Sequence, residues 1–358
     1  MNMDQLFHTM REKEASDLHL KPGAVPTVRV HGKLLPLDHF KAPSSRELET
    51  LFQEMTTEGQ QAEFNRQQEL DFSHHSEEDM RFRVNASRQR GQISLAIRRV
   101  ALEIPTIDEL GLPGICKTLA LKKQGLILVT GPTGSGKSTT LASMIDHLNQ
   151  REARRIVTVE DPIEYLYQDK ESFITQRELG SDTRSFAVAT TQALRQDPDV
   201  ILVGEMRDRK TIAACITAAE TGHLVLSTLH TNNAPQSIDR IVNSFPPHQQ
   251  SQIRMQLSLT LLAVLAQRLL PRQDRKGRLP VMEIMVANNA VRNLIREGKT
   301  HQMQNVIQTG QGEDMQTLER SLHQHYREGV ISLDTALANA NDKNALKSLL
   351  RGQTSPGL

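Results

Sequence analysis

A glycine-rich segment between an apolar run and a helix-like pattern carries the clearest chemical signal in this sequence. It consists of Gly131, Pro132, Thr133, Gly134, Ser135, Gly136, Lys137, Ser138 and Thr139. In this spacing, backbone N–H groups can surround phosphate oxygens while Lys137 reaches the terminal phosphates and Ser138 reaches Mg²⁺. The start of the following helix also favours an anion. The pattern therefore predicts a P-loop for a nucleoside triphosphate, taken as ATP with Mg²⁺, rather than a merely flexible glycine loop.

Acidic side chains follow two further apolar runs. Glu205 comes after the run 200–203 and Gly204, and we expect it to position the attacking water or Mg²⁺. In the sequence VEDPIEY, Glu160 would lie near Mg²⁺, and Glu164 is a second candidate for orienting water or the metal. By spacing alone, Glu205 could be an ordinary surface carboxylate, and Glu160 and Glu164 could cap a helix or stay solvated.

A histidine follows the apolar run 224–228. His230 could sense the γ-phosphate or link it to a neighbouring subunit, and Thr228 and Thr231 offer hydroxyls for the same task. A lone histidine is more often structural. Its place at a strand end, beside two acidic strand ends, favours the functional interpretation.

Three arginines lie on a predicted hairpin within the first hundred residues. Arg81 and Arg83 should face the same side of one strand, and Arg98 lies on the next strand. If this domain brought guanidinium groups against a nucleotide held by the second domain, they would act as an arginine finger. Most other arginines are expected on the solvated surface.

The elements that must position these residues are predicted by apolar periodicity. Four apolar runs, 126–130, 156–160, 200–203 and 224–228, predict strands of a largely parallel sheet with crossover helices. The carboxyl ends of such strands form one crevice, so the chemical residues should meet there. The short apolar run 257–270 contains Gln267 and Arg268, which argues against a membrane span and leads us to predict a buried helix.

The predicted fold class is α/β with a preceding α+β domain. We expect an N-terminal domain at 1–100, a linker at 101–112, an ATPase domain at 113–288 and a helical C-terminal region at 289–358. A length of 358 residues fits two or three domains.

Composition limits the function classes. Lys plus Arg (43) nearly balances Asp plus Glu (42), so no global basic field attracts nucleic acid, and no nucleic-acid partner is expected. Only two cysteines are present, which excludes a four-cysteine zinc site and fits a reducing compartment. The first residues lack the apolar segment of a signal peptide, so we expect a cytoplasmic protein.

Four motifs in order, GPTGSGKSTT, VEDPIEY, ILVGEMRD and STLHTNNA, resemble the secretion ATPase superfamily. Further segments, SDLHLKPGAVPTVRVHGKL, RFRVNASRQRG and AVRNLIRE, are similar to its type IV pilus retraction ATPases, the PilT/PilU group. The short N-terminal part and the missing cysteines distinguish the chain from extension and type II secretion ATPases.

This resemblance implies a homohexamer of subunits with a PAS-like N-terminal domain and a RecA-like ATPase domain, with nucleotide between them. It implies that Glu160 and Glu164 belong to the acidic box, Glu205 is the Walker B glutamate and His230 belongs to the histidine box. The implied partners are an inner-membrane pilus platform protein and a paralogous retraction ATPase. The chain would then lie at the inner face of the cell membrane, attached only through partners.

Three functions remain open at this point. The leading hypothesis is a motor that couples ATP hydrolysis to pilus retraction and twitching motility. The tail ALANANDKNALKSLL is as similar to PilU as to PilT, so a nucleotide-binding accessory subunit of the retraction motor is the alternative. A DNA-handling P-loop motor is a third hypothesis, which predicts a basic channel or patch.

Overall fold

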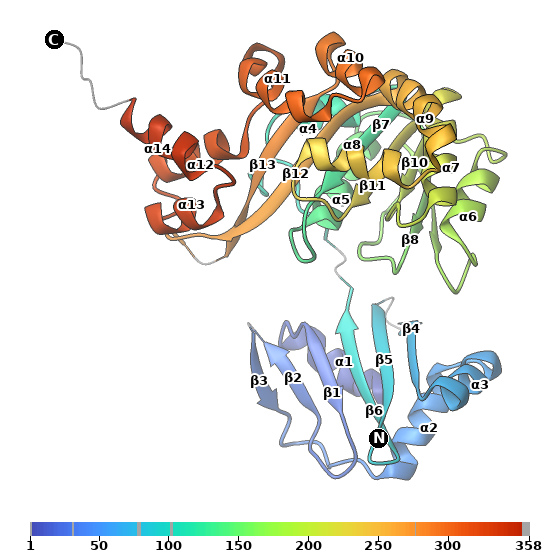
Figure 1. Ribbon diagram of the computed structural model, residues 1–358. Helices are drawn as coiled ribbons and strands as arrows, with labels where there is room; N and C mark the ends of the chain where they lie inside the picture. Colours follow the sequence, from blue (N-terminus) through green and yellow to red (C-terminus); the bar gives the residue numbers. More distant parts are fainter. Residues whose placement is uncertain (1, 31, 77–79, 101–102, 276, 353–358) are drawn as a thin grey trace. The chain divides into compact units, whose positions relative to one another are not determined.

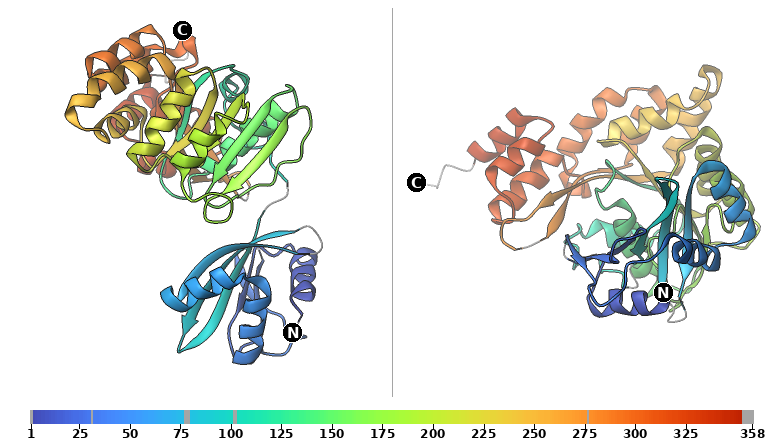
Figure 2. Two further views of the ribbon diagram at one scale, coloured as in Figure 1. Left: turned by 90° about the vertical axis from the view of Figure 1, so that its right-hand side faces the viewer. Right: turned by 90° about the horizontal axis from the view of Figure 1, so that it is seen from below.

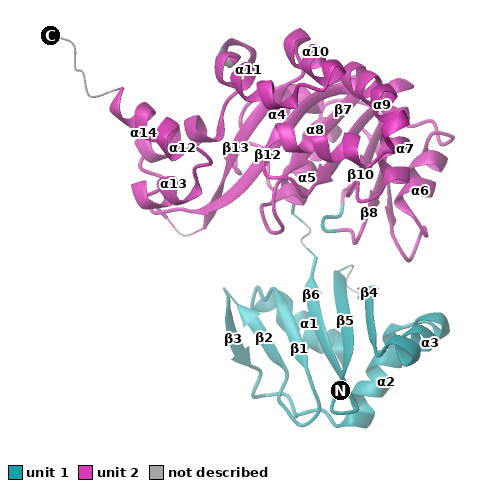
Figure 3. Ribbon diagram, viewed as in Figure 1, with its two compact units in different colours: residues 1–103, 164–166 teal, residues 104–163, 167–358 magenta. Residues whose placement is uncertain are grey.

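The computed structural model describes residues 2–30, 32–76, 80–100, 103–275 and 277–352. The chain forms two compact units (Figures 1 and 3). Unit 1 contains Met1–Glu103 with Glu164–Leu166, and unit 2 contains Ile104–Ile163 and Tyr167–Leu358.

Unit 1 is an α+β domain with a six-stranded antiparallel sheet in the order β3-β2-β1-β6-β5-β4. Its elements are α1 (Met3–Glu12), β1 (Asp17–Leu20), β2 (Thr27–Val30), β3 (Lys33–Pro36), α2 (Ser45–Met55), α3 (Glu58–Gln67), β4 (Glu69–His75), β5 (Arg81–Gln89) and β6 (Gln92–Arg99). The expected hairpin is present as β5 and β6. Its two-residue turn, Arg90 and Gly91, has positive φ at both positions, as a tight hairpin between twisted strands requires.

The core of unit 1 follows from the alternation along its strands. In β4 and β6, buried residues mostly alternate with more exposed ones, so one face of the sheet packs against the helices. Phe7 of α1 stacks on Phe82 of β5, with ring centroids 3.9 Å apart. The helix α2 begins with a capping box between Ser44 and Glu47.

Unit 2 is an α/β domain with a seven-stranded sheet in the order β13-β12-β7-β11-β10-β8-β9. All neighbouring strands are parallel except β12 and β13. The strands are β7 (Gly125–Thr130), β8 (Arg155–Glu160), β9 (Phe173–Glu178), β10 (Val200–Val203), β11 (Leu224–Leu229), β12 (Leu261–Pro271) and β13 (Arg278–Val286). The four strands expected from the sequence are all present, and they are neighbours at the centre of the sheet.

Helices cover both faces of this sheet (Figures 1 and 2). One face packs against α4 (Ile115–Ala120) and α5 (Lys137–Asn149) in one apolar cluster. The other face packs in a second cluster against α6 (Phe186–Ala193), α7 (Arg209–Glu220), α8 (Ala234–Asn243), α9 (Pro247–Thr260), α10 (Asn289–Glu297) and α11 (Met303–Thr309). Because both faces are covered, central strands such as β7 and β11 are buried at every position.

The C-terminal helices α12 (Leu318–Arg327), α13 (Leu333–Asn339) and α14 (Lys343–Arg351) form a separate apolar cluster with the ends of β12 and β13. Two short 3₁₀ turns, η1 (Thr300–Gln302) and η2 (Gln311–Glu313), flank α11. The helical character predicted from residue 289 onward is therefore present in the described residues of this region. None of the helices that the structure describes is both long and apolar enough to cross a membrane.

The prediction of a buried helix at 257–270 is wrong for most of its length. Helix α9 ends at Thr260, and the remaining residues form the strand β12 between β7 and β13. A short apolar run that is covered on both faces has the same composition in a helix and in an internal strand, so periodicity could not separate them.

The segment 104–112, expected as part of a linker, packs with unit 2. Ile107 and Leu112 are buried in the cluster that contains β7 and α5. The hydroxyl of Ser143 on α5 also donates to the carbonyl of Pro105 at 2.5 Å. Residues 101 and 102 of the same expected linker lie outside the described residues. The domain boundaries stay predictions.

Candidate active site

The glycine-rich segment joins β7 to α5, the strand–loop–helix order that a P-loop requires. Three glycines have positive φ: Gly131 (143°), Gly134 (77°) and Gly136 (84°). A Cβ on Gly131 would lie 2.2 Å from the backbone oxygen of Gln267, and one on Gly136 would lie 2.9 Å from its side-chain nitrogen. At these two positions only glycine avoids both a strained conformation and a clash.

Polar groups gather in this loop in a way that fits a phosphate ligand. Lys137 Nζ donates to the carbonyls of Gly131 and Pro132, at 2.9 and 3.0 Å. The hydroxyl oxygens of Thr130 and Ser135 are buried and have no hydrogen-bond partner within the described part of the chain. Buried polar atoms without partners are uncommon in folded proteins, so they indicate a ligand or water at this position. Ser138 is exposed in the first turn of α5.

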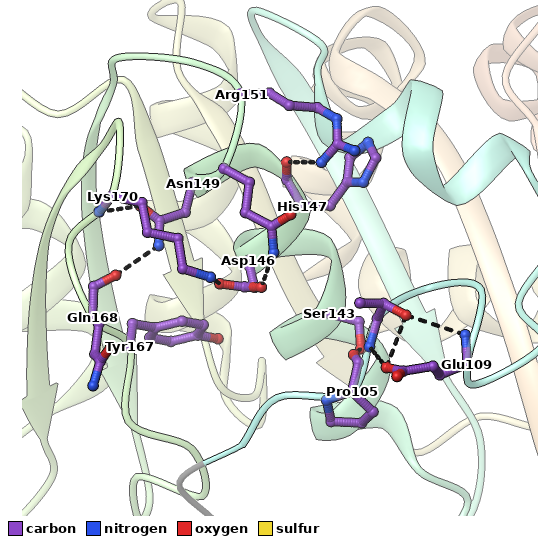
Figure 4. Close-up of polar contacts among 12 residues, drawn as sticks. Pro105, Glu109, Ser143, Asp146, His147, Asn149, Arg151, Tyr167, Gln168 and Lys170 are labelled. Carbon is purple, nitrogen blue, oxygen red and sulfur yellow. Dashed lines mark hydrogen bonds and ion pairs between the residues drawn. The ribbon is translucent and has the colours of Figure 1, made fainter.

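The helix that carries Lys137 and Ser138 is held along its C-terminal half by polar contacts (Figure 4). Asp146 Oδ1 lies 2.6 Å from Lys170 Nζ, and Asn149 donates to the carbonyl of Gln168 at 2.8 Å. The hydroxyl of Ser143, also on α5, donates a hydrogen bond to the carbonyl of Pro105. These contacts fix α5 against two chain segments and so help fix the loop at its start.

The strand ends predicted to carry the chemistry lie next to one another. The sheet order β7-β11-β10-β8 places the glycine loop beside His230, which follows β11, then Glu205, which follows β10, then Glu160, the last residue of β8. These strands are parallel, so all four ends lie at one edge of the sheet. The convergence expected from the sequence is present.

Glu205 lies between two side chains. His230 Nε2 lies 3.3 Å from Glu205 Oε1, and Arg207 Nε donates to Glu205 Oε2 at 2.8 Å. The side chain of Glu205 is 18% exposed, whereas those of His230 and Arg207 are 43% and 60% exposed. The hydrogen bond to Glu205 raises the pKa of Arg207, so its guanidinium stays charged. Arg207 was missed in the sequence because it resembles many surface arginines.

The ends of β10 and β11 are tied together by hydroxyl groups. Ser227 Oγ donates to the carbonyl of Val203, and Thr228 Oγ1 donates to that of Gly204, both at 2.6 Å. Thr231 Oγ1 is within 2.7 Å of Ser237 Oγ. The hydroxyls of Thr228 and Thr231, expected to serve a phosphate, therefore bond within the protein and support the loops around Glu205 and His230.

A glycine stands between the end of β10 and Glu205 for a steric reason. A Cβ on Gly204 would lie 3.3 Å from the carbonyl oxygen of Val159 and 3.4 Å from the Cα of Glu160. The backbones of β8 and β10 approach closely there, and the backbone N–H of Gly204 donates to the same Val159 carbonyl. Gly204 thus allows the backbones of β8 and β10 to approach closely at the two strand ends that lead to Glu160 and Glu205.

The residues of VEDPIEY differ in their surroundings. Glu160 Oε1 accepts hydrogen bonds from Thr158 at 2.6 Å and Gln176 at 3.1 Å, which hold its carboxylate at the strand end. Asp161 Oδ2 lies 3.7 Å from an Arg207 nitrogen. Glu164 is exposed and belongs to the segment grouped with unit 1, so its role stays a prediction.

Within the described ranges, no group of three or more His, Cys, Asp or Glu side chains is placed to hold a metal ion. A magnesium site of the expected kind does not need one, because Mg²⁺ in nucleotide sites is held by phosphate oxygens, waters and one or two protein groups.

The predicted arginines all lie in unit 1 and differ in environment. Arg81 is buried, with its guanidinium 3.4 Å from Ser73 Oγ, whereas Arg83 is exposed. Arg98 Nε donates to Asp17 at 2.8 Å. A role at the nucleotide depends on how the two units are placed relative to one another, so it stays a prediction.

Comparison with known proteins agrees with this site. The family model described as type II/IV secretion system protein matches residues 3–338. The chain is 40% identical to the type IV pilus ATPase PilU of Pseudomonas aeruginosa over 98% of this chain and 92% of the relative. It is 42% identical to the type IV pilus retraction ATPase PilT of the same organism over 95% of this chain and 98% of the relative.

The fold agrees as well. A crystal structure of the pilus retraction motor PilT with bound ADP is similar with a TM-score of 0.90 and 43% identity, covering 97% of this chain and 99% of that one. The identities to PilT and PilU are nearly equal, so identity does not separate the two. The chain therefore belongs to the type II/IV secretion system protein family, as an ATPase of its PilT/PilU group.

Proposed function

We propose that this chain is the subunit of a hexameric cytoplasmic motor that uses ATP hydrolysis to withdraw type IV pili. The names of its relatives, which include a retraction ATPase and a twitching motility protein, support this biological role. The motor would lie at the inner face of the cell membrane, held there by an inner-membrane pilus platform protein.

One observation carries the hydrolytic half of the proposal: Glu205 lies at a strand end in the same row as the phosphate loop, with Arg207 and His230 on its two oxygens. A carboxylate fixed in this way can orient a water and accept its proton as that water attacks the γ-phosphate. Lys137 and the loop N–H groups would stabilise the charge on the phosphates.

Magnesium is part of this proposal because the loop fits it chemically. Ser138 would bind Mg²⁺ through its hydroxyl, and Glu160 would hold a water of the ion's shell. The bound ion would neutralise charge on the β- and γ-phosphate oxygens. The side chains of Thr158 and Gln176 hold Glu160 in position for this task.

Motion would follow from differential binding. If arginines of unit 1 contact a nucleotide held by unit 2, the nucleotide would bind more tightly to an arrangement that makes this contact, so binding and hydrolysis would shift the equilibrium between arrangements. This coupling requires Arg81, Arg83 or Arg98 to meet the γ-phosphate.

Substitution of Glu205 tests the hydrolytic half. Glu205→Gln keeps the size and both polar atoms but removes the base, so ATP turnover should fall about 100-fold or more while ADP binding stays within about two-fold of wild type. Steady-state phosphate release and ADP titration measure the two quantities. Turnover close to that of wild type would remove Glu205 from its assigned role.

Complementation tests the biological half and separates it from the accessory alternative. In a strain that lacks both retraction ATPases, this chain alone should restore twitching if it is the motor. A PilU-like accessory subunit would restore twitching only together with a PilT partner. The Glu205→Gln protein is the control in both strains, because we expect it to bind nucleotide with little turnover.

A further inference from the structure

A buried glutamine of the strand next to the phosphate loop makes contacts that the nucleotide-binding motif does not include. Gln267 lies on β12, which pairs with β7 in a parallel register that ends at Ala266 opposite Thr130. Gln267 is therefore the next residue along the strand, beside the point where the chain leaves β7 for the glycine loop. Its exposed fraction is 2%.

The side-chain amide of Gln267 makes hydrogen bonds to the loop region through both its nitrogen and its oxygen. Its Nε2 donates to the backbone carbonyl of Ser135 at 2.6 Å, and its Oε1 accepts from Thr140 Oγ1 at 2.8 Å. Ser135 and Thr140 are 3% and 1% exposed. One side chain thus joins the end of the loop to the first turn of α5 through two buried hydrogen bonds.

Gln267 also sets the shape of the loop by contact. Its backbone oxygen occupies the space that a Cβ of Gly131 would need, and its Nε2 does the same for Gly136. The loop therefore lies against Gln267 both at Gly131, where the loop begins, and at Gly136, near its end. The donated bond to Ser135 orients the peptide that joins Ser135 to Gly136, whose N–H belongs to the phosphate cradle.

The strand that carries this glutamine is itself anchored. The next residue, Arg268, donates from its two terminal nitrogens to the carbonyl of Asn339 and to Asn341 Oδ1, each at 2.5 Å. A contact made from a fixed strand can hold a loop in one conformation, whereas a contact from a mobile segment cannot.

We propose that Gln267 is a positioning residue for nucleotide binding, which holds the phosphate loop in its binding conformation through Ser135 and Thr140. It acts on the ligand through the loop and touches no reacting atom. This inference rests on the ATPase activity of the chain, and it adds a residue outside the glycine-rich motif to the machinery.

The test is ADP affinity, measured by titration in the presence of Mg²⁺, of wild type and Gln267→Met. Methionine has a similar length but makes neither hydrogen bond, so affinity should fall about ten-fold, since buried polar partners are left unpaired. Gln267→Glu keeps the acceptor for Thr140 but places a carboxylate under an anion-binding loop, so its affinity should fall further. The matched control is Gln273→Met, because that exposed glutamine bonds to Gly329 away from the loop.

Two readouts separate positioning from a general loss of structure. Thr140→Val should weaken ADP binding, Thr140→Ser should retain more affinity because it keeps the hydroxyl, and the Thr140→Val/Gln267→Met double variant should lose less than the product of the single losses. Melting midpoints without nucleotide identify any variant that does not fold, and in that event Thr140→Val alone carries the test.

The outcomes are distinct. ADP affinity within two-fold of wild type in Gln267→Met, or in Thr140→Val if the first variant does not fold, would overturn the proposal. A loss of ADP affinity in the double variant equal to the product of the two single losses would also overturn the proposal. If the wild-type chain itself binds no ADP, the nucleotide-binding function fails, and that result is seen before any variant is compared.

Discussion

Two side chains lie against Glu205, one at each carboxylate oxygen, and they differ in what they can contribute. Arg207 is charged at every accessible pH, and its bond to Glu205 is 2.8 Å long, whereas His230 lies at 3.3 Å. Arg207 is also more than half exposed, so its electrostatic effect is screened by water. Its main contribution is therefore to the direction in which the carboxylate points.

Replacing Arg207 by alanine should slow the chemical step more than it weakens binding. Without the guanidinium, Glu205 can rotate, so we expect kcat to fall about ten-fold while the KM for ATP changes less than about two-fold. Steady-state turnover over a range of ATP concentrations gives both values. Arg209→Ala is the matched control, since that arginine is exposed two residues further on. An equal loss in both variants would contradict the positioning role.

At this scale, the sequence predicts residues whose type and spacing are unusual. The glycine loop, Glu205 and His230 are identifiable because they follow apolar strands, and the structure places them in one row. Arg207 is not identifiable, because it resembles other surface arginines although it bonds to Glu205 only two residues away. Gln267 is not identifiable for a different reason, because it bonds to Ser135, which is 132 residues away. Only the strand pairing of β7 and β12 reveals that contact.

At the scale of elements, β13 joins two helices, of which α8 follows the segment that carries His230. Glu283 on β13 is 1% exposed and accepts a hydrogen bond from the backbone of Ala234, the first residue of α8, at 2.8 Å. Its other oxygen accepts from Gln304 of α11 at 3.3 Å. A side-chain oxygen at a helix N-terminus satisfies one of the N–H groups that have no partner within the helix. Glu283 thus fixes α8, which begins four residues after His230.

The stability of the protein should depend on the titration of Glu283. Burial raises the pKa of Glu283, with a smaller contribution from Glu319, while the hydrogen bond from Ala234 and the charge of Arg268 act against the shift. Because the folded state holds this proton to higher pH than the unfolded state, the free energy of unfolding should fall as pH rises from the ordinary glutamate pKa through the raised one.

Glu283→Gln should remove that decline, because glutamine still accepts from Ala234 but does not ionise. The stability of Glu283→Gln relative to wild type should therefore increase between pH 4 and pH 8, as measured by urea unfolding. Glu283→Ala leaves the Ala234 N–H unpaired and should cost about 1–3 kcal/mol. The exposed Glu49→Gln serves as control, and the same pH dependence in that variant would refute the assignment to Glu283.

The sequence predicts the strands that have clear boundaries, and it does not separate a helix from a strand when both lie in one apolar run. The parallel strands β7, β8, β10 and β11 are bounded by turns or charged residues, so each is recognisable. The run 257–270 is mostly apolar and divides into the end of α9 and most of β12 without a glycine or proline between them. Its division depends on the pairing of β12 with β7, which no local pattern encodes.

At the scale of the whole molecule, each unit has its own apolar core, and the predicted γ-phosphate contact comes from unit 1. In the sheet of that unit, one row of paired residues contains Arg83, Arg98, Asp17 and Arg29 in order across β5, β6, β1 and β2. Asp17 is 2.8 Å from Arg98 and 3.8 Å from Arg29. The carboxylate thus lies between two of the arginines.

At the β5 end of this row, Arg83 has different surroundings. Arg83 is exposed and stands opposite Arg98, a residue of the same charge, and like charges in directly paired positions destabilise a sheet. An anionic ligand at Arg83 would relieve that repulsion. The environment of Arg81 is different again, because it is buried and its removal should affect folding. Of the three predicted arginines, Arg83 is therefore the one that we expect to meet the γ-phosphate.

Three alanine variants test this choice. Arg83→Ala should lower kcat for ATP by about 100-fold or more, in line with the effect of removing an arginine finger, and should leave ADP affinity within about two-fold, since ADP lacks the γ-phosphate. Arg98→Ala should have a smaller effect on kcat, because Arg98 already neutralises Asp17. Arg81→Ala should mainly lower the melting midpoint. If Arg98→Ala slows turnover more than Arg83→Ala does in equally stable proteins, Arg98 is the sensing residue and the argument from the charge row is wrong.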